Sequence, residues 1–188
     1  MATTAIFIEI VMAGVFALAW VLLLLSRLGI FPSATVFSSL IQYKDWTTGI
    51  LIVAFAAVYL LGMAMNTVSF VITHPLVGQK RRDALFPGEE YATIWARVFQ
   101  KGSNELMKDI LLNFTFIRVY RSAIFNFFFL GVTLLLYGKR FMLASVLCLL
   151  AATLFYFLWG KVFLIYYQLV RSAHEVLKDV PLEKKETI

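Results

Sequence analysis

The sequence predicts an all-α, polytopic membrane protein with four transmembrane helices, and two observations support this. Four apolar tracts, 5–25, 46–72, 122–137 and 141–160, contain a single charged side chain, that of Glu9. The 188-residue chain is also 61% hydrophobic, with a mean hydropathy of +0.84, which is too apolar for a large soluble core with an added anchor. Crossing a hydrocarbon core takes about 20 residues of helix. We therefore expect one membrane domain, residues 1–188, with spans at about 5–26, 46–68, 118–137 and 141–161.

The first span is expected to remain in the mature protein, because the residues before it lack the basic region of a signal peptide. A short outer interfacial helix is expected between spans one and two. There Val36, Phe37, Leu40 and Ile41 recur at helical spacing, and Ser33 is a suitable N-terminal cap.

A helical segment at about 79–117 is predicted between spans two and three, on the cytoplasmic side. Tyr91, Ile94, Trp95, Val98 and Phe99 share one face of an amphipathic helix that should end near Gly102. A second short amphipathic helix is expected from about residue 103. The pattern lets span two continue through 68–73, and the His74-Pro75 pair should end it, because the residue before proline is pushed out of α conformation.

Spans three and four are joined only by residues 137–140, so they should form an antiparallel hairpin. Beyond the fourth span, apolar residues continue at helical spacing to Pro181. At 1.5 Å per residue, this extension at about 162–179 should project roughly 20 Å or more into the cytoplasm.

The distribution of charge predicts the orientation. Twelve Lys and Arg residues fall on the side that holds both termini and the 79–117 segment, against four on the other side. By the positive-inside rule, both termini are expected in the cytoplasm, and we assign the chain to the bacterial inner (plasma) membrane. The candidate surface for anionic lipid headgroups or a cytosolic protein partner comprises Lys80, Arg81, Arg82, Trp95 and Arg97. A simple solvated charge run is the alternative interpretation of the basic cluster.

Counting residues inward from the outer boundary predicts a polar belt at one depth in the spans. Its candidate residues are Glu9, Asn66, Arg118, Arg121, Asn126 and Lys161, with Asn126 deeper than the rest. Two interpretations are open. Either Glu9 pairs with Lys161 or an arginine and fixes the helix packing, or it faces a water-filled path in which carboxylates from several subunits select cations.

No catalytic, cofactor-binding or metal-binding motif is apparent, so neither an enzymatic activity nor a cofactor is predicted. His74 and His174 are the only histidines, Cys148 is the only cysteine, and no nucleophile motif Gly-x-Ser-x-Gly is present. Direct nucleic-acid binding is not expected either, because no recognised DNA- or RNA-binding motif accompanies the basic residues.

The predicted function is therefore that of a homo-oligomeric integral membrane protein, forming a pore or channel or a membrane-embedded sensor-effector. In architecture the chain resembles the small four-span effector subunits encoded in bacterial anti-phage defence operons. That resemblance implies gating by, or docking to, a cytosolic partner. The alternatives are a non-conducting membrane scaffold that recruits a cytosolic protein and, more weakly, a lipid-modifying membrane enzyme.

Overall fold

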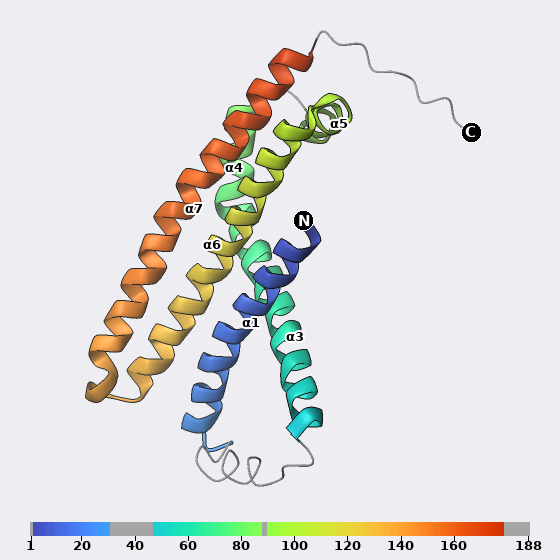
Figure 1. Cartoon of the computed structure of the whole chain (residues 1–188). Helices are drawn as coiled ribbons and strands as arrows, with labels where there is room; N and C mark the ends of the chain where they lie inside the picture. Colours follow the sequence, from blue (N-terminus) through green and yellow to red (C-terminus); the bar gives the residue numbers. More distant parts are fainter. Residues whose placement is uncertain (1, 31–46, 88–89, 179–188) are drawn as a thin grey trace.

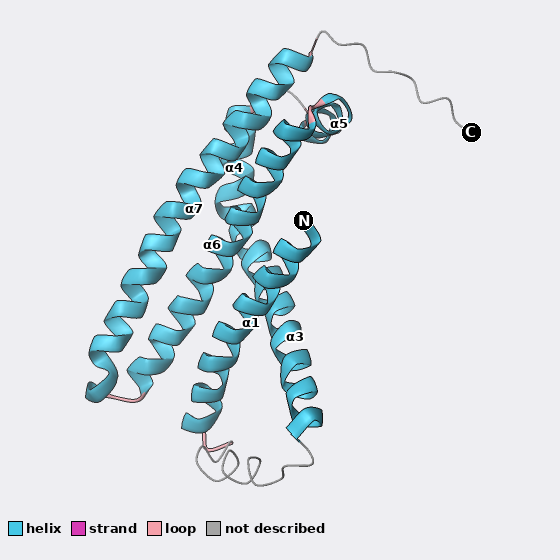
Figure 2. Ribbon diagram, viewed as in Figure 1, coloured by secondary structure: helices cyan, strands magenta, loops and turns pink. Residues whose placement is uncertain are grey.

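The computed structural model describes residues 2–30, 47–87 and 90–178. Over these ranges the protein consists of helices and turns, without a β-strand (Figure 2). Four helices are long and apolar enough to cross a membrane: α1 (Ala2–Arg27), α3 (Thr47–Thr73), α6 (Asn104–Leu136) and α7 (Met142–Leu177). The all-α class and the four candidate spans are thus confirmed. The interfacial helix expected after Ser33 lies outside the described residues.

Small residues bring α1 and α3 together where the two helices cross (Figure 1). A Cβ atom added at Gly14 would overlap the carbonyl oxygen of Val58, and one added at Gly62 would overlap that of Ile10. Ala17, one turn after Gly14, is completely buried. Close backbone approach of this kind is the usual basis of helix association in lipid.

Proline does not end the second long helix as the sequence suggested. After α3, the chain continues through a π-helical turn, η2 (His74–Gly78), into α4 (Gln79–Leu85). Pro75 lacks the N–H that an α-helix would use, and its ring crowds the preceding turn. The wider π turn accommodates both effects, and the Gln79 N–H bonds to the His74 carbonyl oxygen five residues back.

The segment before span three is also more continuous than predicted. The amphipathic helix α5 (Tyr91–Lys101) ends before Gly102, as expected. The Ser103 side chain then caps α6 by accepting a hydrogen bond from the Leu106 N–H at 3.2 Å. The expected separate short helix and span three are one 33-residue helix. The reason is that residues 104–136 contain no proline and no glycine before Gly131.

The helices α6 and α7 form the predicted antiparallel hairpin and lie side by side along much of their length (Figure 1). Gly138 makes the turn with φ of 86°, and the short 3₁₀ helix η3 (Lys139–Phe141) leads into α7. The 33 and 36 residues of α6 and α7 correspond to helices of about 50 and 54 Å. Each exceeds a hydrocarbon thickness of about 30 Å by some 20 Å.

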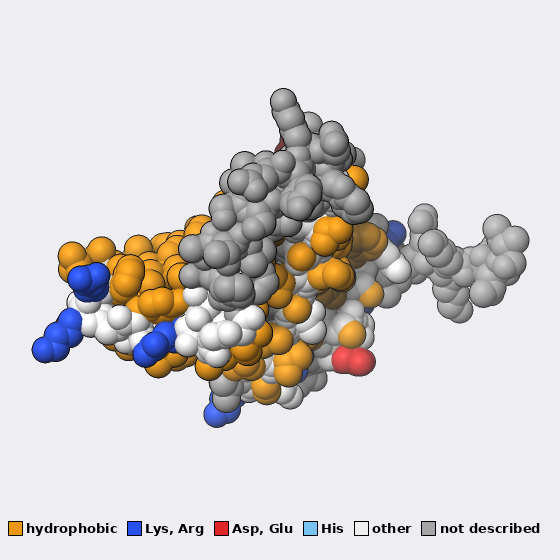
Figure 3. All heavy atoms as spheres, turned by 90° about the horizontal axis from the view of Figure 1, so that it is seen from below, with side chains coloured by type: hydrophobic (Ala, Val, Ile, Leu, Met, Phe, Trp, Pro, Cys, Tyr) orange, Lys and Arg blue, Asp and Glu red, His pale blue; other side chains and the backbone are white. Residues whose placement is uncertain are grey.

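The surplus length of α6 and α7 packs with α4 and α5 into a unit that we call the head, residues 79–87, 90–117 and 162–177. The main hydrophobic core lies here and continues to Trp159. Its buried members are Phe86, Ile94, Val98, Ile110, Ile117, Trp159, Phe163, Tyr166, Tyr167, Val170 and Ala173. Viewed from the hairpin end, by contrast, much of the described surface is hydrophobic, and basic side chains stand out at the α6–α7 turn (Figure 3).

Candidate functional site

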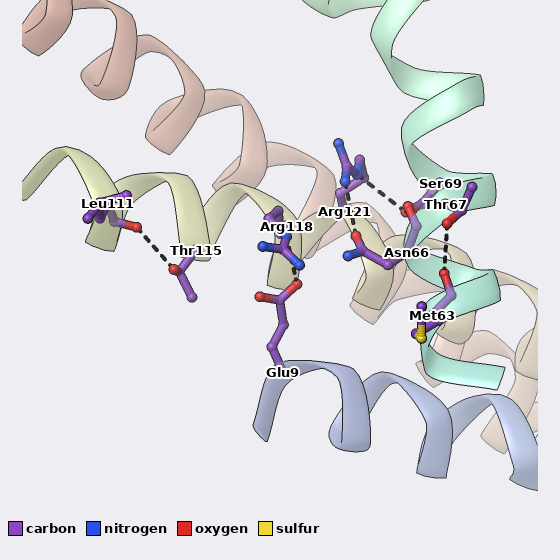
Figure 4. Close-up of polar contacts among 9 residues, drawn as sticks. All are labelled: Glu9, Met63, Asn66, Thr67, Ser69, Leu111, Thr115, Arg118 and Arg121. Atoms are coloured by element: carbon purple, nitrogen blue, oxygen red, sulfur yellow. Dashed lines mark hydrogen bonds and ion pairs between the residues drawn. The ribbon is translucent and has the colours of Figure 1, made fainter. Parts of the chain in front are cut away.

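The carboxylate of Glu9, on α1, faces the guanidinium of Arg118, on α6 (Figure 4). The Arg118 Nε lies 3.2 Å from the Glu9 Oε1, and the two side chains are only 17% and 3% exposed. Neither Glu9 oxygen has a hydrogen bond within the described part of the chain, so the contact is one of charge without good N–H geometry. Of the partners that the sequence left open for Glu9, the structure selects an arginine and not Lys161, which is exposed on α7.

Arg121 is the second cation of the belt and joins α6 to α3 (Figure 4). Its Nη2 donates to the Asn66 Oδ1 at 3.0 Å, and its Nε donates to the Ser69 Oγ at 3.3 Å. The guanidinium also lies over the Phe70 ring, 5.1 Å from the centroid. Arg121 is buried. Glu9, Asn66, Arg118 and Arg121 therefore form one polar network across three helices.

Asn126 belongs to a different contact, which packs α6 on α1. Its Nδ2 donates to the Ala13 carbonyl oxygen at 3.1 Å, and its Oδ1 accepts from the Trp20 Nε1 at 3.1 Å. The side chain is buried and bonded through both ends. The sequence placed Asn126 in the belt but gave no indication of its partner Trp20.

A cavity of about 180 Å³ adjoins Arg121 on the side of the head, and we call it the aromatic cavity. Its walls come from the end of α3, η2, α5, α6 and α7. The lining residues are Phe70, Thr73, His74, Gly78, Tyr91, Trp95, Phe114, Ile117, Arg121, Trp159, Phe163, Tyr166 and Tyr167. The predicted helix end at His74-Pro75 is instead the π turn that forms part of this wall.

Hydrogen-bond donors are present in the wall of the aromatic cavity. The Trp159 Nε1 is buried and has no hydrogen-bond partner within the described ranges. The Tyr91 and Tyr166 hydroxyls lie 3.1 Å apart. Burial, and then the neighbouring Tyr166, raises the pKa of Tyr91 well above its ordinary value, so this phenol stays protonated. Together with Arg121, these groups favour a ligand that accepts hydrogen bonds and has an apolar body.

The five residues predicted as a lipid or partner surface lie on α4 and α5, and two of them, Arg82 and Trp95, line one hollow of about 560 Å³. Lys80 is exposed on α4, and Arg82 forms an ion pair with Asp83 at 2.9 Å. Arg81 lies in α4 as well. Trp95 lines the aromatic cavity, whereas Arg97 lines a separate hollow of about 330 Å³ with His174. Successive positions of α5 face different directions, which explains the separation.

The aromatic cavity is the feature that sequence reasoning missed. Tyr166 lies in the stretch whose helical spacing predicts the extension of the fourth helix, and Trp159 lies within the fourth predicted span. The signal available was the high density of aromatic residues between 155 and 167. In the structure several of them pack with Tyr91 and Trp95.

No cluster of His, Cys, Asp and Glu suited to a metal ion occurs in the ranges 2–30, 47–87 and 90–178. The chain matches no protein-family model, and no curated protein or solved structure is similar enough to indicate a relative. The fold and the site thus define a class only: an all-helical protein with four helices able to cross a membrane. Its polar network and its aromatic cavity share one residue, Arg121.

Proposed function

We propose that this chain is a membrane-embedded sensor-effector, in which the head receives a signal and the spans respond. The observation that carries this proposal is the double position of Arg121. The same guanidinium binds Asn66 and Ser69 on α3 and lines the aromatic cavity. A ligand in the cavity therefore acts on the contact that holds α3 to α6.

The hydrogen-bond donors of Arg121 that are unused within the described ranges support this coupling. A guanidinium carries five N–H donors, and two of them have acceptors within the described ranges. The cavity has room for about six water molecules at roughly 30 Å³ each, enough for a small ligand or the tip of a larger one. An acceptor placed there competes with Asn66 for Arg121, so binding weakens one interhelical bond and strengthens another.

The output of such a sensor is conduction or recruitment. In one protomer, Glu9 is held by Arg118. For Glu9 to join a ring of carboxylates around a water-filled path, it would have to leave Arg118. We propose that conduction, if it is the output, belongs to the signalled state. A non-conducting scaffold that recruits a cytosolic protein is the alternative output, and we assign the chain no enzymatic activity.

We propose that the protein works as a homo-oligomer. On α7, strongly exposed apolar residues recur at alternating spacings of four and three: Leu143, Leu147, Leu150, Leu154 and Phe157. Each is more than half exposed. This is the heptad spacing with which helices pair through an apolar seam. It supports α7 as the contact between copies.

Orientation and cellular setting are part of the same proposal. The excess of basic residues on the head side supports a cytoplasmic position for both termini and the head, by the positive-inside rule. Lys80, exposed on α4, would then lie near anionic headgroups of the bacterial inner membrane. A cytosolic partner would meet the head, as in the four-span effectors of anti-phage operons that the chain resembles in architecture.

The proposal is tested by filling the aromatic cavity from within. A Cβ at Gly78 would lie 3.7 Å from both Phe163 and His74, so Gly78→Leu places a side chain at the cavity without a backbone clash. Gly49→Leu is the matched control, because no described residue lies within 4 Å of a Cβ there. Spin labels at the exposed positions Met12 and Leu154, in a Cys148→Ser background in liposomes, report the distance between α1 and α7.

We expect Gly78→Leu to change the distance distribution between the labels, and Gly49→Leu to leave it as in the parent protein. An unchanged distribution in folded Gly78→Leu would overturn the sensor proposal. Ion flux measured on the same liposomes then identifies the output. Flux that appears only with Gly78→Leu supports a gated pore, and a changed distance without flux supports recruitment of a partner.

A further inference from the structure

A further hollow borders the aromatic cavity and shares Phe70, Phe114 and Arg121 with it. It is an open groove of about 310 Å³ between α3 and α6, lined by Asn66, Thr67, Phe70, Phe114, Arg118 and Arg121. We infer that this groove binds the phosphate of an anionic phospholipid. The inference does not depend on the sensor proposal, because it concerns a lipid in this groove and not a ligand in the aromatic cavity.

The network beside the groove carries an excess of positive charge. The network contains two arginines and one carboxylate, Glu9, so one positive charge in excess is held in a largely buried place. A buried charge is costly unless an opposite charge is supplied, and more so at the depth of a membrane span. Arg118 and Arg121 are three residues apart on α6 and line the same groove. Both guanidinium groups can therefore reach one phosphate.

The groove also lies at a suitable depth for a lipid headgroup. Arg118 precedes Gly138 by 20 residues, which is about 30 Å of helix and equals the hydrocarbon thickness. When the α6–α7 turn lies at one surface of a bilayer, the groove is at the level of the opposite headgroups. Basic pockets between transmembrane helices at this level typically bind anionic headgroups.

The apolar surface beside the groove also fits a lipid. Phe70 and Phe114 line the groove and are 47% and 43% exposed. Met63 on α3, about one turn from Asn66 toward the middle of the span, is 46% exposed. Acyl chains that extend from the groove into the bilayer would cover Met63, whereas a free phosphate ion would leave it bare. The groove is thus suited to a phosphate with hydrocarbon attached.

Glu9 is the internal competitor for this site. Its carboxylate neutralises Arg118 but makes no hydrogen bond in the described part of the chain. A phosphate offers more acceptor oxygens and can meet the two guanidinium groups with straight N–H contacts. Removing the charge of Glu9 should therefore favour the lipid, whereas removing the charge of either arginine should disfavour it.

Native mass spectrometry of the full chain in detergent, titrated with phosphatidylglycerol or phosphatidylcholine, tests the inference. We expect the wild type to retain phosphatidylglycerol in preference. Arg118→Gln and Arg121→Gln should weaken retention about tenfold each, since each removes a charge-assisted contact. Glu9→Gln should strengthen it several-fold. Lys161→Gln is the control for loss of a positive charge. Lys161 is exposed on α7 and does not line the groove, so this variant should retain phosphatidylglycerol as the wild type does.

The opposite signs separate binding from a structural role. Glu9→Gln and Arg118→Gln break the same ion pair, so a purely structural network moves both variants in one direction, and that result overturns the inference. Equal retention of both lipids overturns it too, as does binding of inorganic phosphate without binding of phosphatidylglycerol. If Arg121→Gln does not fold, Arg121→Lys replaces it, and we expect this variant to retain part of the phosphatidylglycerol binding. Glu9→Gln then supplies the opposite sign.

Discussion

The head and the spans of this protein are held together in different ways. The head buries large side chains against one another, among them Ile94, Ile110 and Val170, which are almost wholly inaccessible. The spans instead cross at Gly14 and Gly62 and leave most of their large apolar side chains exposed. Burial of apolar surface stabilises a structure only against water, so its use in the head and not in the spans is what a bilayer around the spans would require. Four predictions test this comparison.

The largest expected effect separates a buried residue of the head from an exposed one of the spans. Ile110 is completely buried, so Ile110→Ala should lower the free energy of unfolding by about 2–5 kcal/mol. Leu150, on α7, is 60% exposed, so Leu150→Ala should change it by less than about 0.5 kcal/mol. Denaturant unfolding of the monodisperse protein in detergent measures both. Equal losses at the two positions would contradict the distinction.

The crossing of α1 and α3 should fail through overlap and not through lost burial. Gly62→Val places atoms against the Ile10 backbone, and we expect a cost of about 1–3 kcal/mol with separation of the two helices. The matched control is Gly49→Val, where a Cβ meets no atom of the described ranges within 4 Å. Disulfide cross-linking between cysteines placed on α1 and α3 measures the separation. Unchanged cross-linking in Gly62→Val would show that the crossing tolerates the side chain.

Alkaline pH should weaken the head through Tyr91. Its pKa in the folded protein is raised by burial, so the unfolded state loses its phenol proton first, near pH 10. The stability that the protonated phenol contributes is therefore complete below about pH 10. Above it, the loss is about 1.4 kcal/mol per pH unit until the folded pKa is reached. Unfolding curves at increasing pH measure the slope, and Tyr91→Phe should make it shallower. An identical slope in Tyr91→Phe would contradict this account.

The smallest of the four effects concerns a hydrogen bond between spans. Trp20→Phe keeps an aromatic ring beside Phe129 but removes the indole donor to Asn126. Hydrogen bonds between helices in membranes average about 0.6 kcal/mol and reach about 1.7 kcal/mol. We expect a loss in that range, and a double-mutant cycle with Asn126→Leu isolates it. A coupling energy near zero would mean that the Trp20–Asn126 bond adds nothing to the packing of α1 on α6.

The parts of the fold that local sequence determines were predictable. Apolar tracts with a single charge located the four long helices, Gly102 ended α5, and the short connection at Gly138 required a hairpin. The extension of α7 followed from uninterrupted helical spacing and is present to Leu177. The error at Pro75 arose because a preference against α conformation was interpreted as a helix end, whereas a widened turn relieves the same crowding.

The site was less predictable, because a helix that is apolar on all sides has no recognisable face. Residue counting placed Glu9, Asn66, Arg118 and Arg121 at one depth, and the structure brings these four together. The same counting could not give the rotation of each helix, so it also included Lys161, which is exposed on α7. The aromatic cavity depends on residues from five helical elements meeting, which no single stretch of sequence records.

The π turn at His74–Gly78 has a consequence for how this chain can change in evolution. A π turn holds one residue more than an α turn, as if a single residue had been inserted into a continuous helix. One residue corresponds to about 100° of rotation around a helix axis. Deleting a residue within 74–78 would therefore rotate all of α4 and turn Phe86 away from Tyr91 and Tyr167, whose rings it now contacts. The side of α4 that faces α7 is thus set by the length of the chain at a single turn.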